Sequence, residues 1–219
     1  MLLVLDVNET LLDVSALDPV ISDVVGMPGD SARRIWFDRM IRSSMTITAA
    51  GGYVPFGALA ASALRDVAGE RGGEVSMAQI ERLAEGIRTL PAHPDVAPGL
   101  RRLRADGHRI ATLTNSVLEV AEAQLRSSGL IDLVDAVYSA DEVQRLKPAG
   151  EPYRMVLERE HADQAMLVAA HDWDVTGAAM AGLDTAFLGR EGRLPFSAVA
   201  EPTYVAPDLL ELADLLAAN

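Results

Sequence analysis

Short apolar runs alternate with longer amphipathic stretches along most of the chain. The runs are rich in valine, leucine and isoleucine, and they are too short to be buried helices, so the pattern predicts buried parallel strands. We expect strands at residues 2–5, 109–114, 136–138, 166–170 and 185–188, and a weaker one at residues 203–205.

Helical periodicity fills the stretches between these strands. Two of the helices predicted this way end at a glycine, the usual residue just past a helix C-terminus. The predicted helices cover residues 96–106, 117–128 and 151–160. Strands that alternate with helices indicate an α/β fold with a Rossmann-like parallel sheet and helices on both of its faces.

The segment from residue 14 to residue 92 breaks this alternation. It shows helical periodicity, turn signals at residues 26–29 and at Gly51 and Gly52, and no convincing strand. Prolines at positions 91, 94 and 98 mark the return to the alternating pattern. We therefore predict a core domain of residues 1–13 and 93–219 that carries a helical cap domain of residues 14–92.

Composition and charge exclude several classes of protein. The 219 residues are 49% hydrophobic, which is enough for a buried core, and the net charge of −13 makes nucleic acid and membrane surfaces poor partners. The absence of cysteine excludes disulfides, thiolate catalysis and cysteine-bound metals. The opening apolar run is too short for a signal peptide or a membrane span, so we expect a cytoplasmic protein.

Polar side chains follow the predicted strands at the points where they end. The carboxyl ends of parallel strands meet at one edge of the sheet, where ligands bind in such folds. Each of these residue types also caps helices or forms turns, so the prediction depends on their occurring together. The residues are Asp6, Asn8, Glu9 and Thr10 after the first strand, Thr114, Asn115 and Ser116 after the second, Lys147 after the third, and His171, Asp172 and Asp174 after the fourth.

Lys147 is the only lysine in the chain, and every other basic side chain is arginine. A compact ammonium fits where a planar guanidinium does not, so the position can require lysine, although an arginine-rich composition would also explain it. Because Lys147 lies in a predicted loop, we expect it to matter for charge and much less for packing.

Four segments in order resemble the motifs of the haloacid dehalogenase superfamily, and most of all those of its L-2-haloacid dehalogenase family. They are residues 5–11 (LDVNETL), 112–115 (TLTN), 146–148 (LKP) and 171–174 (HDWD). The resemblance implies a hydrolase that cleaves the carbon–halogen bond of a small 2-haloacid. Asp6 would attack the carbon and form an ester that water then hydrolyses. It also implies a homodimer.

The resemblance assigns further residues to this site. Thr10, Thr114 and Asn115 match positions around the nucleophile and the substrate carboxylate, while Lys147 and Tyr153 match a lysine and a tyrosine of the family. Ile41, Phe56 and Trp173 match apolar pocket positions, although packing in the core would explain each of them equally well. The family's halide-binding arginine is replaced by Phe37, whose aromatic edge would act together with Asn115 instead.

Asn8 stands where the phosphatases of the superfamily have a second aspartate. A phosphate dianion beside a carboxylate nucleophile needs a metal ion, whereas a monoanionic haloacid does not. The sequence therefore predicts a reaction without metal or other cofactor. A phosphatase acting on a small phosphate ester and a catalytically silent binding protein with the same fold remain as alternatives.

The fourth motif departs from the family pattern, because Ala169 and His171 replace its small polar residue and its asparagine. We predict that His171, paired with Glu9, is the base that activates water. An unperturbed imidazole has a pKa of about 6.5 and is mostly neutral near pH 7. Asp174 matches the family's aspartate and competes for the same role.

Overall fold

The computed structural model describes residues 1–195 and 201–218. The described residues form a six-stranded sheet in the order β3-β2-β1-β4-β5-β6, and every neighbouring pair is parallel. The strands are β1 (Leu2–Leu5), β2 (Arg109–Thr114), β3 (Ala136–Ser139), β4 (Ala165–Ala169), β5 (Asp184–Leu188) and β6 (Tyr204–Ala206).

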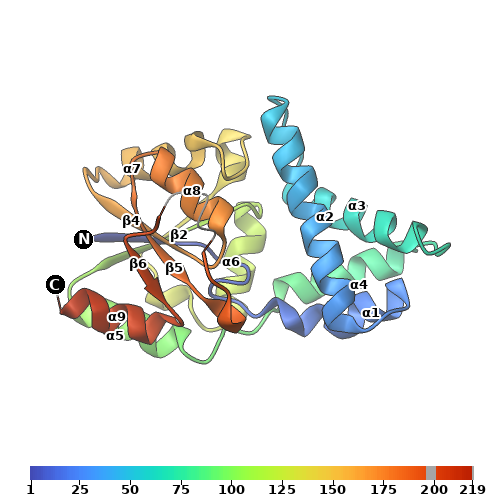
Figure 1. Cartoon of the computed structure of the whole chain (residues 1–219), viewed down its shortest axis with the longest axis horizontal. Coiled ribbons are helices and arrows are strands. Elements are labelled where there is room, and N and C mark those ends of the chain that lie inside the picture. The colour runs from blue at the N-terminus through green and yellow to red at the C-terminus, as the bar shows by residue number, and fades with distance from the viewer. Residues whose placement is uncertain (196–200, 219) are drawn as a thin grey trace.

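The helices form two groups. Between β1 and β2 the chain makes α1 (Asp18–Val25), α2 (Gly29–Ala49), α3 (Phe56–Gly69) and α4 (Met77–Arg88), and we call these four helices the helical insertion. The helices beside the sheet are α5 (Val96–Ala105), α6 (Leu118–Ser127), α7 (Gly150–Glu160), α8 (Asp172–Met180) and α9 (Leu209–Ala217). Figure 1 shows the helical insertion to one side of the sheet.

Alternating residues of the central strands point to opposite faces of the sheet, and both faces are covered. Leu3 and Leu5 belong to one buried cluster with side chains of α5, α6 and α9. Leu2 and Val4 belong to a second cluster with side chains of α7 and α8. Burial on both faces explains why these strands read as continuous apolar runs rather than as an alternating pattern.

The predicted α/β class and parallel sheet are confirmed, with small differences at the element ends. The last strand lies one residue later than expected, at Tyr204–Ala206, and α6 begins at Leu118 rather than at residue 117. Element ends are the least well determined part of a sequence pattern, because fraying and capping shift them by a residue or two.

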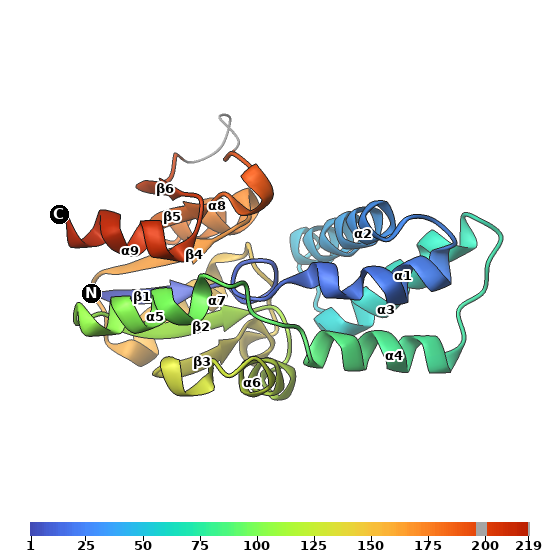
Figure 2. The ribbon, with the colours of Figure 1, turned by 90° about the horizontal axis from the view of Figure 1, so that it is seen from below.

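The helical insertion is joined to the sheet by two antiparallel segments. Leu12 forms a bridge with Ala92, and the His93 amide donates to the Leu11 carbonyl oxygen at 3.0 Å, where the chain leaves and returns. Within the insertion, the Trp36 indole of α2 donates to the Ala60 carbonyl oxygen of α3 at 2.9 Å. Figure 2 shows α4 approaching α6, so the insertion borders the carboxyl edge of the sheet. The domain limits at residues 14 and 92 stay a prediction.

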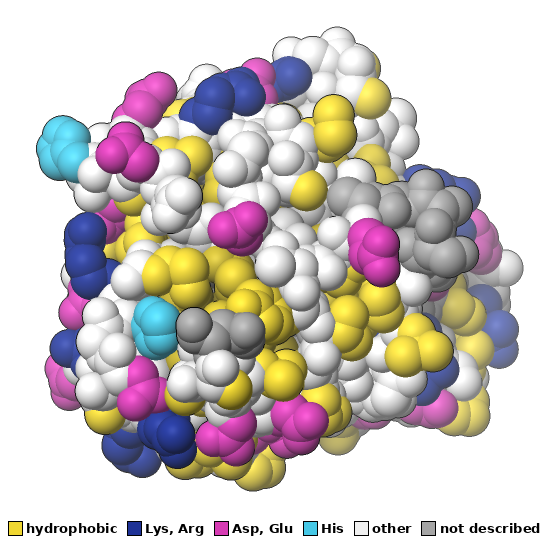
Figure 3. Space-filling model, turned by 60° about the vertical axis from the view of Figure 1, so that its left-hand side comes forward, with side chains coloured by type: hydrophobic (Ala, Val, Ile, Leu, Met, Phe, Trp, Pro, Cys, Tyr) yellow, Lys and Arg dark blue, Asp and Glu magenta, His cyan; other side chains and the backbone are white. Residues whose placement is uncertain are grey.

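The surface is mixed in character. Figure 3 shows one face, on which acidic and basic side chains are interspersed around a central group of hydrophobic ones. Within the described residues, no helix has the length and apolar character that crossing a membrane requires.

Candidate active site

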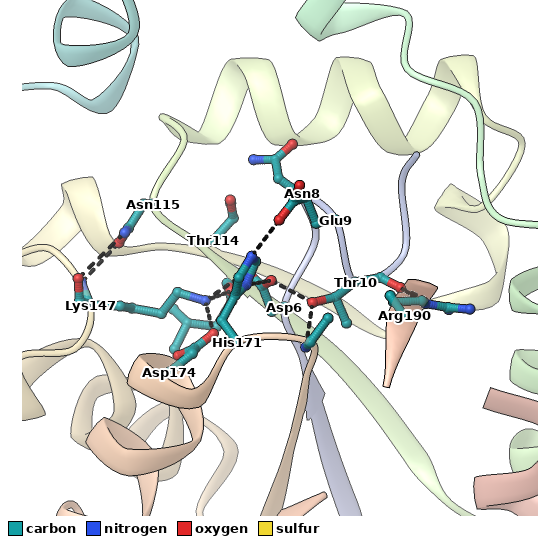
Figure 4. A network of polar contacts seen from close by, with 12 residues as sticks. Asp6, Asn8, Glu9, Thr10, Thr114, Asn115, Lys147, His171, Asp174 and Arg190 are labelled. Carbon is teal, nitrogen blue, oxygen red and sulfur yellow. Dashed lines mark hydrogen bonds and ion pairs between the residues drawn. The ribbon is translucent and has the colours of Figure 1, made fainter. Parts of the chain in front are cut away.

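The polar residues that follow the strands meet at the carboxyl edge of the sheet, as predicted (Figure 4). Asp6 follows β1, Asn115 follows β2, and His171 lies between β4 and α8. Lys147 reaches the same place from the loop before α7, where the Asn115 side-chain oxygen accepts a hydrogen bond from the Lys147 amide at 2.8 Å. Parallel strands and their loops thus bring residues from four distant parts of the chain together.

Asp6 is held on both carboxylate oxygens. Its Oδ1 accepts from Lys147 Nζ at 2.8 Å, and its Oδ2 accepts from the Thr10 hydroxyl at 2.6 Å. The Thr10 oxygen in turn accepts from the Ala170 amide at 3.0 Å. Burial raises the pKa of Asp6, but the charges of Lys147 and His171 outweigh burial and hold the pKa well below its usual range. Asp6 is therefore an ionised, oriented carboxylate.

Lys147 is buried and uses every proton of its ammonium group. Besides Asp6, its Nζ donates to Asp174 Oδ2 at 2.6 Å and to the Leu113 carbonyl oxygen at 2.8 Å, and the residue is 1% exposed. Burial alone lowers the pKa of Lys147, but the two carboxylates raise it above its usual value. The expectation that this lysine matters little for packing is wrong, because its loop folds inward over the carboxyl ends of the strands.

Asp174 has no exposed surface, and both of its carboxylate oxygens are engaged. Lys147 donates to Oδ2, and the hydroxyl of Tyr153, from α7, donates to Oδ1 at 2.5 Å. Tyr153 is itself fully buried, and its pKa is raised well above the usual value by burial and by the Asp174 charge. Tyr153 therefore keeps its proton and acts as a hydrogen-bond donor that fixes Asp174.

His171 bridges two carboxylates with its two ring nitrogens. Nε2 lies 2.9 Å from Glu9 Oε2, and Nδ1 lies 3.4 Å from Asp6 Oδ2. The ring stacks between Phe37 and Trp173, with ring centroids 5.6 Å and 5.0 Å away. Nδ1 is buried and has no hydrogen-bond partner among the described residues. It is thus the nitrogen of this ring that can exchange a proton, because Nε2 is engaged by Glu9.

The expectation that His171 is mostly neutral near pH 7 is wrong for this arrangement. Burial lowers the pKa of His171, but the close contacts with the carboxylates of Asp6 and Glu9 outweigh it and raise the pKa to about 9. In the protein as it stands, the ring is therefore a cation at neutral pH.

Glu9 is fixed by its backbone and by three cationic side chains. Its φ of 61° lies in the left-handed region, which costs free energy for a residue other than glycine and is characteristic of functional sites. The carboxylate contacts Arg33 at 3.4 Å and Arg193 at 3.2 Å as well as His171. Burial raises the pKa of Glu9, but His171 and Arg193 lower it to about 2.

Sequence reasoning missed three arginines around this site. Arg33 and Arg193 pair with Glu9, and Arg190 donates to the Thr10 carbonyl oxygen at 3.1 Å and 2.9 Å while pairing with Asp95. Arg190 lies two residues after β5 and could have been found by the same strand-end rule. Arg33 reaches the site from a helix of the insertion, and no local signal distinguishes it.

The residues present do not fit a magnesium site of the phosphatase kind. Asn8 is neutral, and its side-chain oxygen already accepts from Gln124 at 2.9 Å while its nitrogen lies 3.3 Å from the Ser116 hydroxyl. Between the carboxylates of Asp6 and Asp174 lies the Lys147 ammonium, so the charge that a divalent ion would supply comes from a side chain.

A small cavity lies beside Asp6. Its volume of about 10 Å³ is close to the room that one water molecule needs. It is lined by Asp6, Asn8, Phe37, Ile41, Phe56, Thr114, Asn115, Lys147, His171 and Trp173. Glu9, Thr10 and Asp174 each contact one of these lining residues, and Tyr153 contacts Asp174.

Comparison with known proteins agrees with this geometry. The family model of the haloacid dehalogenase-like hydrolases matches residues 1–182 of this chain. The (S)-2-haloacid dehalogenase 4A of Burkholderia cepacia is 30% identical over 218 residues, which is 99% of this chain and 94% of that protein. A solved dehalogenase structure is 30% identical with a TM-score of 0.90, covering 99% of this chain and 97% of that one. The L-2-haloacid dehalogenase of Xanthobacter autotrophicus with covalently bound chloropropionic acid has a TM-score of 0.91 at 23% identity, covering 99% of this chain and 98% of that one, which shows the shared fold. Because the family model matches most of the chain and a relative is 30% identical over nearly its whole length, the chain belongs to the haloacid dehalogenase-like hydrolase family.

Proposed function

We propose that this hydrolase cleaves the carbon–halogen bond of a small 2-haloacid through an ester on Asp6. The observation that carries the proposal is the surroundings of Asp6, an ionised carboxylate with Lys147 on one oxygen and the Nδ1 atom of His171 beside the other. The relatives whose names specify (S)-2-haloacids support the same substrate class.

The first step is displacement of halide by Asp6. A carboxylate oxygen forms a bond to C2 of the substrate while the carbon–halogen bond breaks and the halide leaves with the electron pair. Two anions must approach each other, and the cationic Lys147 and His171 offset their repulsion. The amide of Asn115 and the edge of Phe37 border the small cavity and face the departing halide in this proposal.

The second step is hydrolysis of the ester at the carboxyl carbon of Asp6. Esterification removes the Asp6 charge, which is one of the two charges that keep His171 protonated, so the ring releases its proton more readily. Its Nδ1 then takes a proton from water, the hydroxide attacks the Asp6 carbon, and the imidazolium formed protonates the departing alkoxide to give the 2-hydroxy acid. His171 lines the small cavity beside Asp6, which is the side from which this water would approach in the proposal.

Asp174 is a weaker candidate for the base. Both of its oxygens are occupied, by Lys147 and by Tyr153, and it has no exposed surface. We propose that Asp174 positions the lysine, and that Glu9 orients His171 and stabilises its cation. Thr10, Thr114 and Asn115 would hold the nucleophile and the substrate carboxylate, and Ile41, Phe56 and Trp173 would enclose the substrate carbon.

Neither alternative fits the site as well. A phosphatase needs a cation ligand where this chain has the bonded amide of Asn8. A silent binding protein has no need for a buried carboxylate held between a lysine and a histidine, an arrangement that costs desolvation.

Oxygen-18 labelling in a single turnover tests the proposal. With enzyme in excess over 2-chloropropionate in labelled water, the product hydroxyl carries unlabelled oxygen from Asp6, and peptide mapping finds the label in Asp6. Labelled product from the first turnover would instead mean direct attack by water. In the same assay, phosphate esters of small alcohols should leave Asp6 unmodified, and phosphorylated Asp6 would favour the phosphatase.

The assembly and location belong to the same proposal. We infer a cytoplasmic homodimer with residues 14–92 as a cap domain, on the strength of the family resemblance. Light scattering at micromolar concentration tests the dimer, and a mass of one chain would contradict it.

A further inference from the structure

A second, much larger cavity adjoins the small one beside Asp6. Its volume is about 250 Å³, against about 10 Å³ for the small cavity. The two share Asn8, Phe37 and Phe56 as lining residues, so only these side chains separate the large cavity from the reactive pocket. It lies where the helical insertion meets α6.

The lining of the large cavity is apolar. Side chains of α2, α3, α4 and α6 supply most of it, including Trp36, Met40, Ala60, Leu83, Ile87 and Val120. Arg88 is the one charged residue of the lining as described, and it is neutralised by Glu119 of α6 at 3.2 Å. An anionic or strongly polar group would therefore be poorly accommodated here, whereas a hydrocarbon group would be stabilised by leaving water.

The reactive pocket by itself has no room for a substituent. A space close to one water molecule in size cannot also hold an alkyl chain on C2 of the substrate. By comparison, an apolar cavity of roughly 150 Å³ binds benzene, so the large cavity has room for a group at least as big as a phenyl ring.

From this adjacency and lining we propose that the large cavity receives the C2 substituent of the substrate, and that the enzyme prefers 2-haloacids with a long alkyl or aryl substituent over 2-halopropionates. The proposal rests on the proposed dehalogenase function. It makes Trp36, Met40 and Leu83 determinants of specificity, at a distance from the groups that react.

The test compares kcat/KM for 2-chloropropionate, 2-chlorobutyrate, 2-chlorohexanoate and 2-chloro-2-phenylacetate by halide release. A buried methylene is worth about 0.8 kcal/mol, so each added methylene should raise kcat/KM about fourfold. A constant or falling series would overturn the inference while leaving the proposed function intact. Absence of halide release from every substrate would overturn both.

A matched pair of variants shows whether the cavity is responsible. Gly57 and Gly69 both lie on α3, and a Cβ added at either meets no atom within 4 Å, so the first atom of a new side chain is accommodated at both. Only Gly57 lines the cavity. Gly57→Leu should lower the ratio of kcat/KM for 2-chlorohexanoate to that for 2-chloropropionate by about tenfold. Gly69→Leu should keep the wild-type ratio, and an equal loss in both variants would overturn the inference.

Discussion

The Nε2 atom of His171 lies 2.9 Å from the Oε2 atom of Glu9, although the two residues are 162 positions apart in the chain. The contact joins the loop after β1 to the start of α8, and it places the other ring nitrogen beside Asp6. The pKa of the His171 imidazole therefore depends on the charge of Asp6, while Glu9, which does not react, holds the ring in place. This arrangement is the basis of the proposed two-step reaction, in which Asp6 reacts first and His171 acts once the Asp6 charge is lost.

The first prediction concerns the protonation of His171. Asp6→Asn removes a charge next to the ring, much as ester formation does, so the pKa of His171 should fall by about one to three units from its value near 9. Glu9→Gln should lower it as well. Histidine titration by NMR measures both effects.

His108 serves as the internal control for that titration. It precedes β2 at the opposite edge of the sheet, and its pKa is lowered by burial and by the chain's amino terminus, neither of which the two variants change. A His171 pKa that stays near 9 in Asp6→Asn would contradict the proposed coupling between esterification and proton release.

The second prediction is a dependence of stability on pH. The pKa of His171 is raised on folding, so its contribution is fully present below about pH 6.5 and is lost as the pH rises through about 9. The free energy of unfolding should therefore fall by about 3 kcal/mol across that range. Urea denaturation should show this loss in the wild type, and a loss of equal size in His171→Phe would assign it to other groups.

The sequence predicted the fold, and it predicted which strand-end residues lie close together, because both depend on local patterns. Apolar runs bounded by polar residues mark buried parallel strands, and the strand-end rule gathers Asp6, Asn115, Lys147 and His171 at one edge without any knowledge of the helix packing. The order of the motifs then gave the family. These parts of the structure follow from the chain's own periodicity.

The sequence could not predict the charge states of the site residues, or the contacts that the residues around them make. Whether His171 is neutral depends on its distances to Asp6 and Glu9, and whether Lys147 is buried depends on how its loop folds. Arg33 of α2 reaches Glu9, which is 24 positions earlier in the chain, only through the packing of the insertion against the loop after β1. The large cavity depends on how four helices pack, which no single segment encodes.

The third prediction is that Lys147→Ala abolishes turnover and also destabilises the protein. The substitution leaves the buried carboxylates of Asp6 and Asp174 without their shared cation, which should cost about 3–5 kcal/mol. Urea denaturation measures the loss. Arg154→Ala on α7 removes a basic side chain that is 55% exposed and should change stability by less than about 1 kcal/mol. Wild-type turnover in Lys147→Ala would refute the proposed role of the lysine.

The fourth prediction concerns metal ions. Because Lys147 supplies the cation between Asp6 and Asp174, and the oxygen of Asn8 is bonded to Gln124, halide release should be unchanged by exhaustive chelation. Steady-state assays with and without chelator measure this. Activity that disappears on chelation and returns with magnesium would show that the charge argument is wrong.

The fifth prediction tests the central claim, that Asp6 forms the ester and His171 hydrolyses it. His171→Ala should release one equivalent of halide from 2-chloropropionate and then stop, and intact mass spectrometry should find the added acyl group on Asp6. His161→Asn, a change at an exposed histidine at the end of α7, should turn over like the wild type. Normal turnover in His171→Ala, together with ester accumulation in Asp174→Asn, would contradict the account and make the aspartate the group that activates water.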